Sequence, residues 1–358
     1  MARDDGETPV KRSPYQVWQS GEGIPVNQGV YVESLHTLDV QPWARIGQTG
    51  AFVNLADQQT DDGWLIELAP GGHTEPLHHL FEMTIYVLEG RGATTFWQKG
   101  TQKQTVEWQS GSLFSAPLNS SYQHYNLDGQ NQARLFAVTN APMIIGIYRN
   151  TDFVFNNDYV FDDRYSLEDS YFTDPGHKIT RNIWKTNFVP DVRRFELEPS
   201  RRGFQAVGMM FSMANNQSIA HVSSFPPGVY KWGHRHGVGA HLLILDGVGY
   251  SLFWFEGEPR RQVDWKVGSL ISPRELEYHQ HFNTGRTPGK YLAFRLGELD
   301  VHRPPEGRGW NTEEGILGIP YEREDPAIYN HYVEECRKHG TEVILPPPQY
   351  AHAAAAPA

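Results

Sequence analysis

The sequence predicts an all-β protein that contains two tandem copies of one barrel or jelly-roll fold. Its 358 residues include 34 Gly and 24 Pro, and 13% of the side chains are aromatic, as expected for aromatic-rich strands joined by many turns. Short apolar segments are separated by glycines, as in MTIYVLEGRGATTFW and HLLILDGVGYSLFWF. Each of these stretches indicates a strand, a turn and a second strand. Such segments at turn-marked intervals are typical of barrels and sandwiches.

An internal repeat indicates that this fold occurs twice. When the chain is shifted by 157 residues, the segment 70–126 aligns with 227–283 without a gap. Matching residues at fixed spacing over such a length are the signature of a duplicated unit. The identical positions include turn glycines, tryptophans and histidines: Gly90 and Gly247, Trp108 and Trp265, and His124 and His281.

The repeat divides the chain into five expected segments. They are an N-terminal arm (1–49), an N-terminal barrel (50–150), a linker (151–205), a C-terminal barrel (206–300) and a C-terminal arm with a disordered tail (301–358). Few helices are expected. The clearest is Pro326–His339 in the C-terminal arm, with Asp325 as its N-cap and Gly340 directly after it.

Composition and motifs exclude several classes of function. The formal net charge of −11 argues against a broad basic surface for nucleic acid. No apolar run is long enough for a membrane span or a signal peptide, and the single cysteine, Cys336, fits a reducing compartment. We therefore expect a cytoplasmic protein. Nucleophile-elbow, Walker-type and dinucleotide-binding glycine motifs are also absent from the sequence.

The densest chemistry lies in Gly228–Gly247, which contains three histidines. On an extended strand His234 and His236 point to the same side and Arg235 to the other. His241 follows a corner formed by Gly237 and Gly239, where the backbone can bend. Neighbouring imidazoles on one strand face can share a metal ion, and they favour zinc, iron, copper or nickel over calcium or magnesium.

These residues resemble the two motifs of the cupin superfamily, and the repeat makes the chain similar to a bicupin. The first motif appears as Gly228, five residues, His234-Arg235-His236, four residues, His241, five residues and Gly247. His241 stands where the family usually has glutamate. The second motif appears as Gly268, Pro273, His279 and Asn283, without the usual Pro-x-Gly. The resemblance covers about half of the chain and leaves out the arms and the linker.

The resemblance implies one metal site, in the C-terminal barrel. His234, His236 and His279 would be its ligands, and His241 would be either a fourth ligand or a residue of the pocket wall. No catalytic residue is expected beyond the metal ligands. The implied cofactor is one divalent metal ion, with Fe(II) ahead of Mn, Ni, Cu, Co or Zn, because histidine ligands accept all of these.

The first copy departs from the motif at most ligand positions. At the offset of 157, the four positions hold Leu77, His79, Thr84 and Tyr122, so one histidine remains. We interpret this copy as a barrel kept for structure. An alternative metal site there would use His78 or His79 with Glu82 and His124, and His73 and Glu75 lie close by.

Four further residues are candidates for substrate binding in the second copy. Tyr230 and Trp232 have the parity of His234 if the strand begins that early, and His281 has the parity of His279. Arg295 lies on an apolar predicted strand and could bind a substrate carboxylate. The alternatives are packing at the barrel rim for the two aromatic residues, a structural role for His281 and solvent exposure for Arg295.

The resemblance favours a dioxygenase. An all-nitrogen ligand set is similar to that of gentisate dioxygenase-like bicupins, in which Fe(II) binds a small oxygenated, aromatic or carboxylated substrate and O2 and a C–C bond is cleaved. One alternative is a decarboxylase or isomerase similar to oxalate decarboxylase, although such enzymes keep a glutamate ligand. Another is a non-enzymatic small-molecule-binding bicupin, as among the seed globulins. Bicupins often form homodimers or larger homo-oligomers, and we expect the same here.

Overall fold

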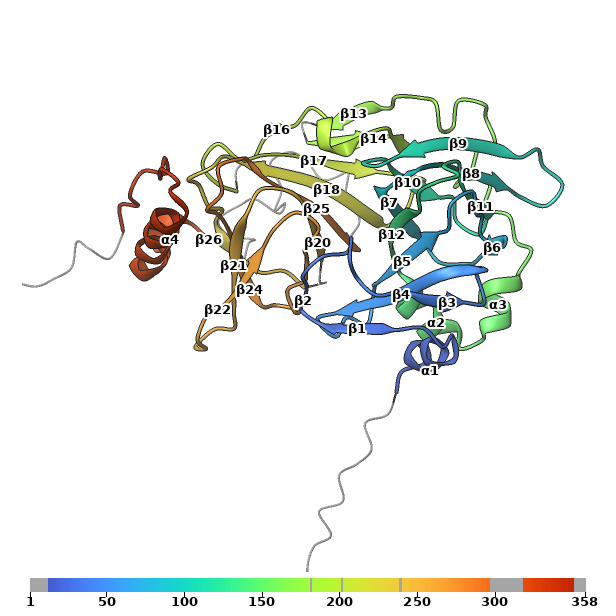
Figure 1. Ribbon diagram of the computed structural model, residues 1–358, viewed down its shortest axis with the longest axis horizontal. Helices are drawn as coiled ribbons and strands as arrows, with labels where there is room; N and C mark the ends of the chain where they lie inside the picture. The colour runs from blue at the N-terminus through green and yellow to red at the C-terminus, as the bar shows by residue number, and fades with distance from the viewer. Residues whose placement is uncertain (1–11, 181, 201, 238–239, 297–317, 351–358) are drawn as a thin grey trace, which may run out of the picture.

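The computed structural model describes residues 12–180, 182–200, 202–237, 240–296 and 318–350. These residues form two similar halves, each made of one large and one small β-sheet (Figure 1). The predicted all-β fold with two tandem copies and few helices is confirmed. The expected disordered tail, the end of the second predicted barrel after residue 296 and the corner residue Gly239 lie outside the described residues.

The first half contains an eight-stranded and a four-stranded sheet. The large sheet has the order β1 (Val26–Gly29), β4 (Gln48–Leu55), β5 (Asp62–Leu68), β12 (Ala133–Thr139), β7 (Met83–Glu89), β10 (Leu113–Ala116) and β15 (Phe188–Val189), with β3 (Gln41–Trp43) beside β4. The small sheet has the order β6 (Leu77–His78), β11 (Ser121–Asn126), β8 (Arg91–Trp97) and β9 (Gln104–Gln109).

The second half repeats this plan with a nine-stranded and a five-stranded sheet. The large sheet has the order β13 (His177–Thr180), β14 (Ile183–Lys185), β17 (Val207–Ser212), β18 (Ser218–Phe225), β25 (Gly289–Leu296), β20 (His241–Asp246), β23 (Leu270–Ile271) and β2 (Tyr31–Val32), with β16 (Glu198–Pro199) beside β17. The small sheet has the order β22 (Arg261–Trp265), β21 (Gly249–Trp254), β24 (Tyr278–Asn283), β19 (Gly233–His234) and β26 (Gly318–Ile319).

Helices lie at the two ends of the molecule (Figure 1). Those of the first half are α1 (Pro14–Gly21), α2 (Ala141–Tyr148) and α3 (Thr151–Asn156); α4 (Pro326–His339) lies at the other end, and short 3-10 turns occupy Val192–Arg194 and Tyr321–Arg323. The C-terminal helix has the predicted bounds. Asp325 caps its first turn by accepting from the Ala327 backbone N–H, and Gly340 ends it in the left-handed conformation.

Two short strands from outside the repeat extend the large sheets of the two halves. β2 belongs to the expected N-terminal arm, yet it pairs with β23 of the second half. β15 belongs to the expected linker, yet it pairs with β10 of the first half. Segments outside the repeat therefore complete the edges of the large sheets, which would otherwise expose unpaired backbone groups.

The two large sheets pack against each other through an apolar layer. Phe136 on β12 and Phe294 on β25 meet across it with ring centroids 5.9 Å apart. This layer explains the continuous apolar sequence of β7, which is buried almost throughout. Its odd positions, such as Ile85, belong to the core of the first half, whereas Tyr86 and Leu88 belong to the layer between the sheets. A strand buried on both faces shows no alternation of polar and apolar residues.

The repeat in the sequence is also a repeat in strand register. In the first half Leu77 pairs with Tyr122, and in the second half His234 pairs with His279, at the same offset. Gly90 and Gly247 likewise both adopt positive φ, +87° and +88°. An added Cβ at Gly90 would lie 2.6 Å from Ala133 Cβ, so only glycine fits this turn.

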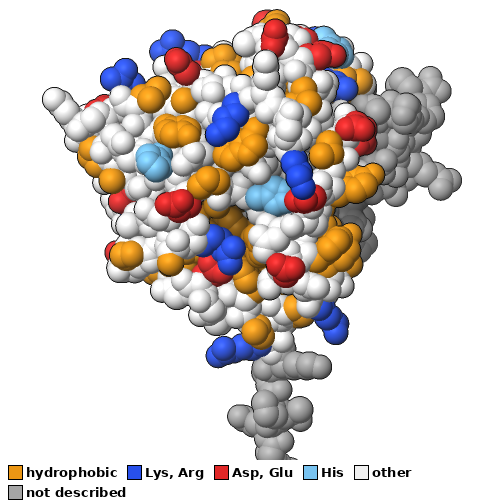
Figure 2. All heavy atoms as spheres, turned by 90° about the vertical axis from the view of Figure 1, so that its right-hand side faces the viewer, with side chains coloured by type: hydrophobic (Ala, Val, Ile, Leu, Met, Phe, Trp, Pro, Cys, Tyr) orange, Lys and Arg blue, Asp and Glu red, His pale blue; other side chains and the backbone are white. Residues whose placement is uncertain are grey.

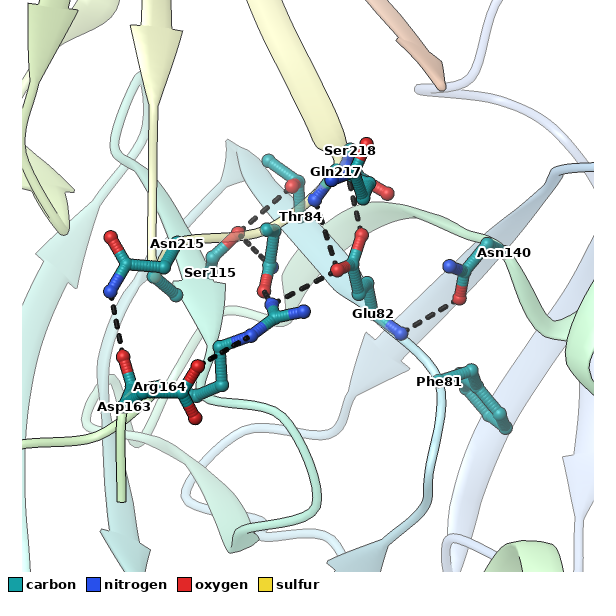
Figure 3. Close-up of polar contacts among 12 residues, drawn as sticks. Phe81, Glu82, Thr84, Ser115, Asn140, Asp163, Arg164, Asn215, Gln217 and Ser218 are labelled. Carbon is teal, nitrogen blue, oxygen red and sulfur yellow. Dashed lines mark hydrogen bonds and ion pairs between the residues drawn. The ribbon is translucent and has the colours of Figure 1, made fainter. Parts of the chain in front are cut away.

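A buried carboxylate links the first half to the beginning of β18 (Figure 3). Glu82 accepts hydrogen bonds from the backbone N–H groups of Gln217 and Ser218, at 3.0 and 2.8 Å, and pairs with Arg164 at 3.1 Å. Its own backbone N–H donates to Asn140. Glu82 therefore serves the contact between the halves and is not turned toward the interior of the first barrel.

The face of the molecule at the end of the first half carries charges of both signs (Figure 2). Lys and Arg side chains are interspersed with Asp and Glu side chains across the described atoms of this face. No helix in the described part of the chain is long and apolar enough to cross a membrane.

Removal of the Glu82 carboxylate should destabilise the protein strongly. Glu82→Ala leaves two backbone N–H groups without their acceptor and removes the closest carboxylate partner of the half-buried Arg164 guanidinium, so we expect a loss of about 3 kcal/mol in the free energy of unfolding. The control is Asp163→Ala, because Asp163 contacts the same Arg164 at 4.0 Å but its side chain is 82% exposed. That variant should lose at most about 0.5 kcal/mol. Urea unfolding measures both, and equal losses would contradict the assignment.

Candidate metal centre

Three histidines of the second half converge on one point. His234 on β19 and His279 on β24 are paired directly across antiparallel strands, and His236 follows two residues later. The ring centroids of His234 and His236 lie 4.2 and 4.9 Å from that of His279. One nitrogen from each of the three rings lies within 4.8 Å of the others. The structure therefore brings together residues from both sequence motifs.

Backbone carbonyls orient two of these rings. His279 Nδ1 donates to the carbonyl of Glu277 at 3.0 Å, and His234 Nδ1 donates to the carbonyl of Trp232 at 3.3 Å. A carbonyl oxygen can only accept, so the proton of each neutral ring is on Nδ1. The lone pair of each Nε2 is thus available for a ligand.

The surroundings keep these imidazoles neutral. Burial, with a further contribution from the neighbouring His279, holds the pKa of His234 well below its ordinary range. Burial, followed by the neighbouring His236, has the same effect on the pKa of His279. A neutral imidazole is the form that binds a metal ion, so no proton has to leave these two side chains at neutral pH.

The three histidines fit a divalent transition metal. A metal–nitrogen bond of about 2.1 Å limits two ligands of one ion to a separation of about 4.2 Å. The nitrogens here lie within 4.8 Å, so small side-chain rotations would close the site. Three nitrogen donors leave further coordination positions open and leave the charge of the ion uncompensated.

His241 does not belong to this group, which corrects the prediction that it is a fourth ligand. It lies on β20 opposite Phe294, on the side of the sheet that faces the first half. Its Nδ1 lies 3.5 Å from a carboxylate oxygen of Asp61, and both side chains are buried. Alternation along β20 directs Leu242 into the second half and His241 out of it. His241 is therefore also not part of the pocket wall.

Tyr230 and Trp232 are likewise directed away from the three histidines. Tyr230 stacks on Phe282 with ring centroids 4.8 Å apart and donates to Glu324, beneath α4. Trp232 lies against Tyr321, at 6.0 Å between centroids. The predicted role of both residues as pocket lining is corrected to packing on the outer surface of the small sheet.

A break in the strand explains this difference. Residue 230 is bridged to β24 and β19 begins at Gly233, but Trp232 between them has no strand pairing. Alternation is therefore interrupted. The side chains of Lys231 and His234, three residues apart, both point inward, whereas strict alternation would place them on opposite sides.

His281 and Arg295 lie on the inner side, as their parity predicts. His281 Nδ1 bonds Ser251 Oγ at 2.8 Å, and its ring lies 5.7 Å from that of His279. Arg295 follows Tyr291 and Ala293 on the same side of β25, and burial lowers the pKa of its guanidinium to about 9. Substrate binding by these two residues remains a prediction.

The interior of the second half contains further polar residues that the motif analysis missed. Lys231 Nζ donates to Ser223 Oγ at 2.6 Å and to the hydroxyl of Tyr291 at 2.8 Å. His221 lies against Tyr291, with 6.0 Å between ring centroids. The repeat contained a signal for these residues. Where the second half pairs His221 with Ala293 and Ser223 with Tyr291, the first half pairs Trp64 with Ala137 and Ile66 with Leu135. Polar replacement of core residues in one copy marks this interior as a candidate binding site.

The first half has an apolar interior at the corresponding positions. His79 is the one histidine that the first half keeps at a motif ligand position. It is buried and bonded through both nitrogens, to the Phe81 carbonyl at 2.8 Å and to the Tyr122 hydroxyl at 2.7 Å. Its ring stacks on Phe81 at 3.7 Å. His78 contacts two backbone carbonyls, and His124 bonds Thr94 Oγ1 at 2.7 Å. Within the described residues, the only cluster able to hold a metal is the one in the second half.

The two inner histidines at equivalent positions have equivalent partners. In the first half Trp108 donates to Thr94 Oγ1 at 2.9 Å, and Thr94 bonds His124. In the second half Trp265 donates to Ser251 Oγ at 3.1 Å, and Ser251 bonds His281. A network present in both copies, only one of which has the histidine cluster, favours a structural role for these tryptophans and hydroxyls.

Solved structures with the same architecture were found, although no protein-family model and no curated protein sequence matches the chain. A mutant of Bacillus subtilis oxalate decarboxylase aligns with a TM-score of 0.51 and 13% identity, over 83% of this chain and 87% of that chain. The formate complex of Lactobacillus farciminis oxalate decarboxylase aligns with a TM-score of 0.53 and 11% identity, over 85% and 93%. Both are bicupins, and the likeness at these identities is one of fold.

Metal retention should depend on His279 and not on His241. His279→Ala leaves two imidazoles at the centre and should abolish the retention of a divalent metal after purification. His241→Ala should retain it, because His241 faces Asp61. His79→Ala in the first half should also retain it. Elemental analysis of the folded variants is the measurement, and loss of metal from all three would refute a single site.

Buried neutral histidines of the first half should make the protein sensitive to acid. Burial lowers the pKa of His79 and of His124 to about 3, against an ordinary value of about 6.5. The unfolded chain therefore binds more protons between these values, and stability should fall as pH falls from about 6.5 toward 3, by up to about 1.4 kcal/mol per pH unit per histidine. His79→Gln should reduce this slope by one proton, measured by urea unfolding at several pH values. His177→Gln, at an exposed position, is the control and should leave the slope unchanged.

Proposed function

We propose that this chain, which has the bicupin fold, is a metal-dependent enzyme that cleaves a C–C bond of a small oxygenated, aromatic or carboxylated substrate in its second barrel. The observation that carries the proposal is the convergence of His234, His236 and His279 from two motifs on one point. A second support is the difference between the copies, because the polar interior occurs where the three histidines are. If both copies served only to stabilise the fold, the second would not need an interior more polar than that of the first.

The chain's own residues define what this site does. His234, His236 and His279 would hold the ion, and His279 is buried, which limits access of water. A divalent metal bound there supplies a Lewis acid and a template for substrate oxygens. Lys231, Tyr291 and His281 lie on the inner side and would position the substrate relative to the three histidines.

The main candidate is a dioxygenase that uses Fe(II) and O2. The nitrogen-only cluster supports it, because three neutral ligands leave coordination positions for both a substrate and O2. The substrate would be an oxygenated, aromatic or carboxylated molecule. The proposed metal is Fe(II), with Mn, Ni, Cu, Co and Zn as the alternatives.

A decarboxylase is the second candidate, and the solved structures favour it. The similar folds are those of oxalate decarboxylases, one of which is described for its Mn(II) centers. In this reading the metal would be Mn(II), and the inner hydroxyl and ammonium groups of Tyr291 and Lys231 would be the nearby proton carriers. A non-enzymatic binding protein is the remaining alternative. The cytoplasmic location and the homo-oligomeric state stay predictions.

Measurement of O2 uptake and CO2 release should distinguish a dioxygenase from a decarboxylase. We expect the purified protein to contain near-stoichiometric divalent metal by elemental analysis, and its absence would exclude both enzymatic candidates. Metal-loaded protein is then mixed with hydroxylated aromatic acids and with dicarboxylates. O2 uptake that matches substrate loss would support the dioxygenase, whereas release of CO2 without net O2 uptake would support the decarboxylase. His279→Ala is the control, and turnover by that variant would contradict a reaction at this centre.

A further inference from the structure

The inner surface of the second half carries a buried positive charge at Lys231. Lys231 and Tyr291 are 2% and 4% exposed, and Ser223 is also buried. In the first half the same strand positions are occupied by Ile66 and Leu135, and Thr74 stands where Lys231 does. The same scaffold thus folds with an apolar interior. Lys231 and its partners are therefore not required by the fold.

The ammonium group of Lys231 is held in a fixed place without an acidic partner. Two of its three N–H groups donate to Ser223 Oγ and to the Tyr291 hydroxyl. Among the described residues no carboxylate forms an ion pair with it. The third N–H group is thus available for an acceptor that the described chain does not supply. Burial lowers the pKa of this ammonium, and a bound anion would offset that effect.

A second cation lies beside Lys231. The backbone of Gly203 bridges that of Lys231, and the carbonyl of Arg202 accepts from the backbone N–H of Trp232 at 3.1 Å. The charge of Arg202 lowers the pKa values of the Lys231 ammonium and the Tyr291 hydroxyl, so its guanidinium lies toward the same inner surface as these two side chains. Among the described residues, the Arg202 side chain also has no acidic partner in an ion pair.

Ring contacts connect Lys231, through its partner Tyr291, to the three histidines. The Tyr291 ring lies 5.3 Å from that of His281, which lies 5.7 Å from that of His279. The charge of Lys231 also acts on His281 and His221. The rings of Tyr291 and His281 therefore lie between Lys231 and the histidine cluster, and these side chains belong to one inner surface.

We infer that Lys231 and Arg202 form an anion subsite beside the three-histidine centre, so that the substrate carries a carboxylate remote from the oxygens that reach the metal. Two charges of the same sign in a buried chamber require a counter-charge, and a carboxylate can accept from both an ammonium and a guanidinium. The inference rests on the proposed function, because it takes the three-histidine centre as the place where the substrate binds. It narrows the substrate to a dianion with separated charges.

Calorimetry with dicarboxylates of increasing length tests the subsite. Malonate, succinate and glutarate, each with its monoamide, are titrated into full-length protein in the metal-loaded and the metal-stripped form. We expect at least one diacid to bind more tightly than its monoamide. Lys231→Met should weaken that diacid by about tenfold or more and leave the monoamide unchanged. Lys266→Met is the matched control, because Lys266 is exposed and paired with Glu33, and it should bind as the wild type does.

The outcomes separate this inference from the proposed function. Equal binding of the diacids by wild type and Lys231→Met, or equal binding of diacid and monoamide, would overturn the subsite even if metal content and turnover were as proposed. Conversely, a protein without metal or turnover could still show the Lys231-dependent binding in its metal-stripped form, which would support the subsite and reject the enzyme. If Lys231→Met does not fold, Arg202→Met, at a less buried position, is titrated with the same diacids and monoamides, and the same loss of diacid binding is expected.

Discussion

The packing of the two large sheets against each other is the constraint on which the arrangement of the site depends. The layer between them buries residues from both halves, including Phe136 and Phe294, and the Glu82 carboxylate adds a polar link at its edge. Since one face of each large sheet is occupied by this layer, only the opposite face and the small sheet can line a pocket. The three histidines lie on the small sheet and the segment that follows β19, where the inner surface is not committed to the contact between halves.

Because the fold is duplicated, the two halves of the chain can be compared with each other. Both halves keep the same turn glycines, the same strand register and the same bond from a tryptophan to a hydroxyl. What differs is the interior. His79 in the first half is bonded on both sides and stacked on Phe81, as a core histidine is, whereas His234 and His279 use one nitrogen on a carbonyl and direct the other toward a common point. Features found in both halves thus belong to the fold, and features of one half belong to its function.

The sequence allowed the fold, the C-terminal helix and the convergence of the three histidines to be predicted, because each depends on local pattern or on motif spacing. Whether a given side chain points into the barrel or out of it was harder to predict. His241 follows a corner and lies on a strand whose two faces are both buried, so no alternation in the sequence distinguishes inside from outside. Tyr230, Trp232 and Lys231 were misassigned or missed because the unpaired Trp232 interrupts alternation just before β19. Such a break is set by tertiary contacts with Tyr321 and Glu324, more than 80 residues away in the chain.

The polar interior of the second half has a cost in stability that the first half avoids. Burial of an ammonium beside a guanidinium, with no acidic partner among the described residues, disfavours the folded protein, whereas the apolar set in the first half shows that the same strands can pack without this cost. Hydrogen bonds from Lys231 to Ser223 and Tyr291 reduce the cost without supplying an opposite charge. A destabilising group that is buried, fixed in position and absent from the sister copy is best explained by a ligand. Since the rings of Tyr291 and His281 connect Lys231 to His279, the metal centre and the cations belong to one binding site, and the substrate would complete its charge balance.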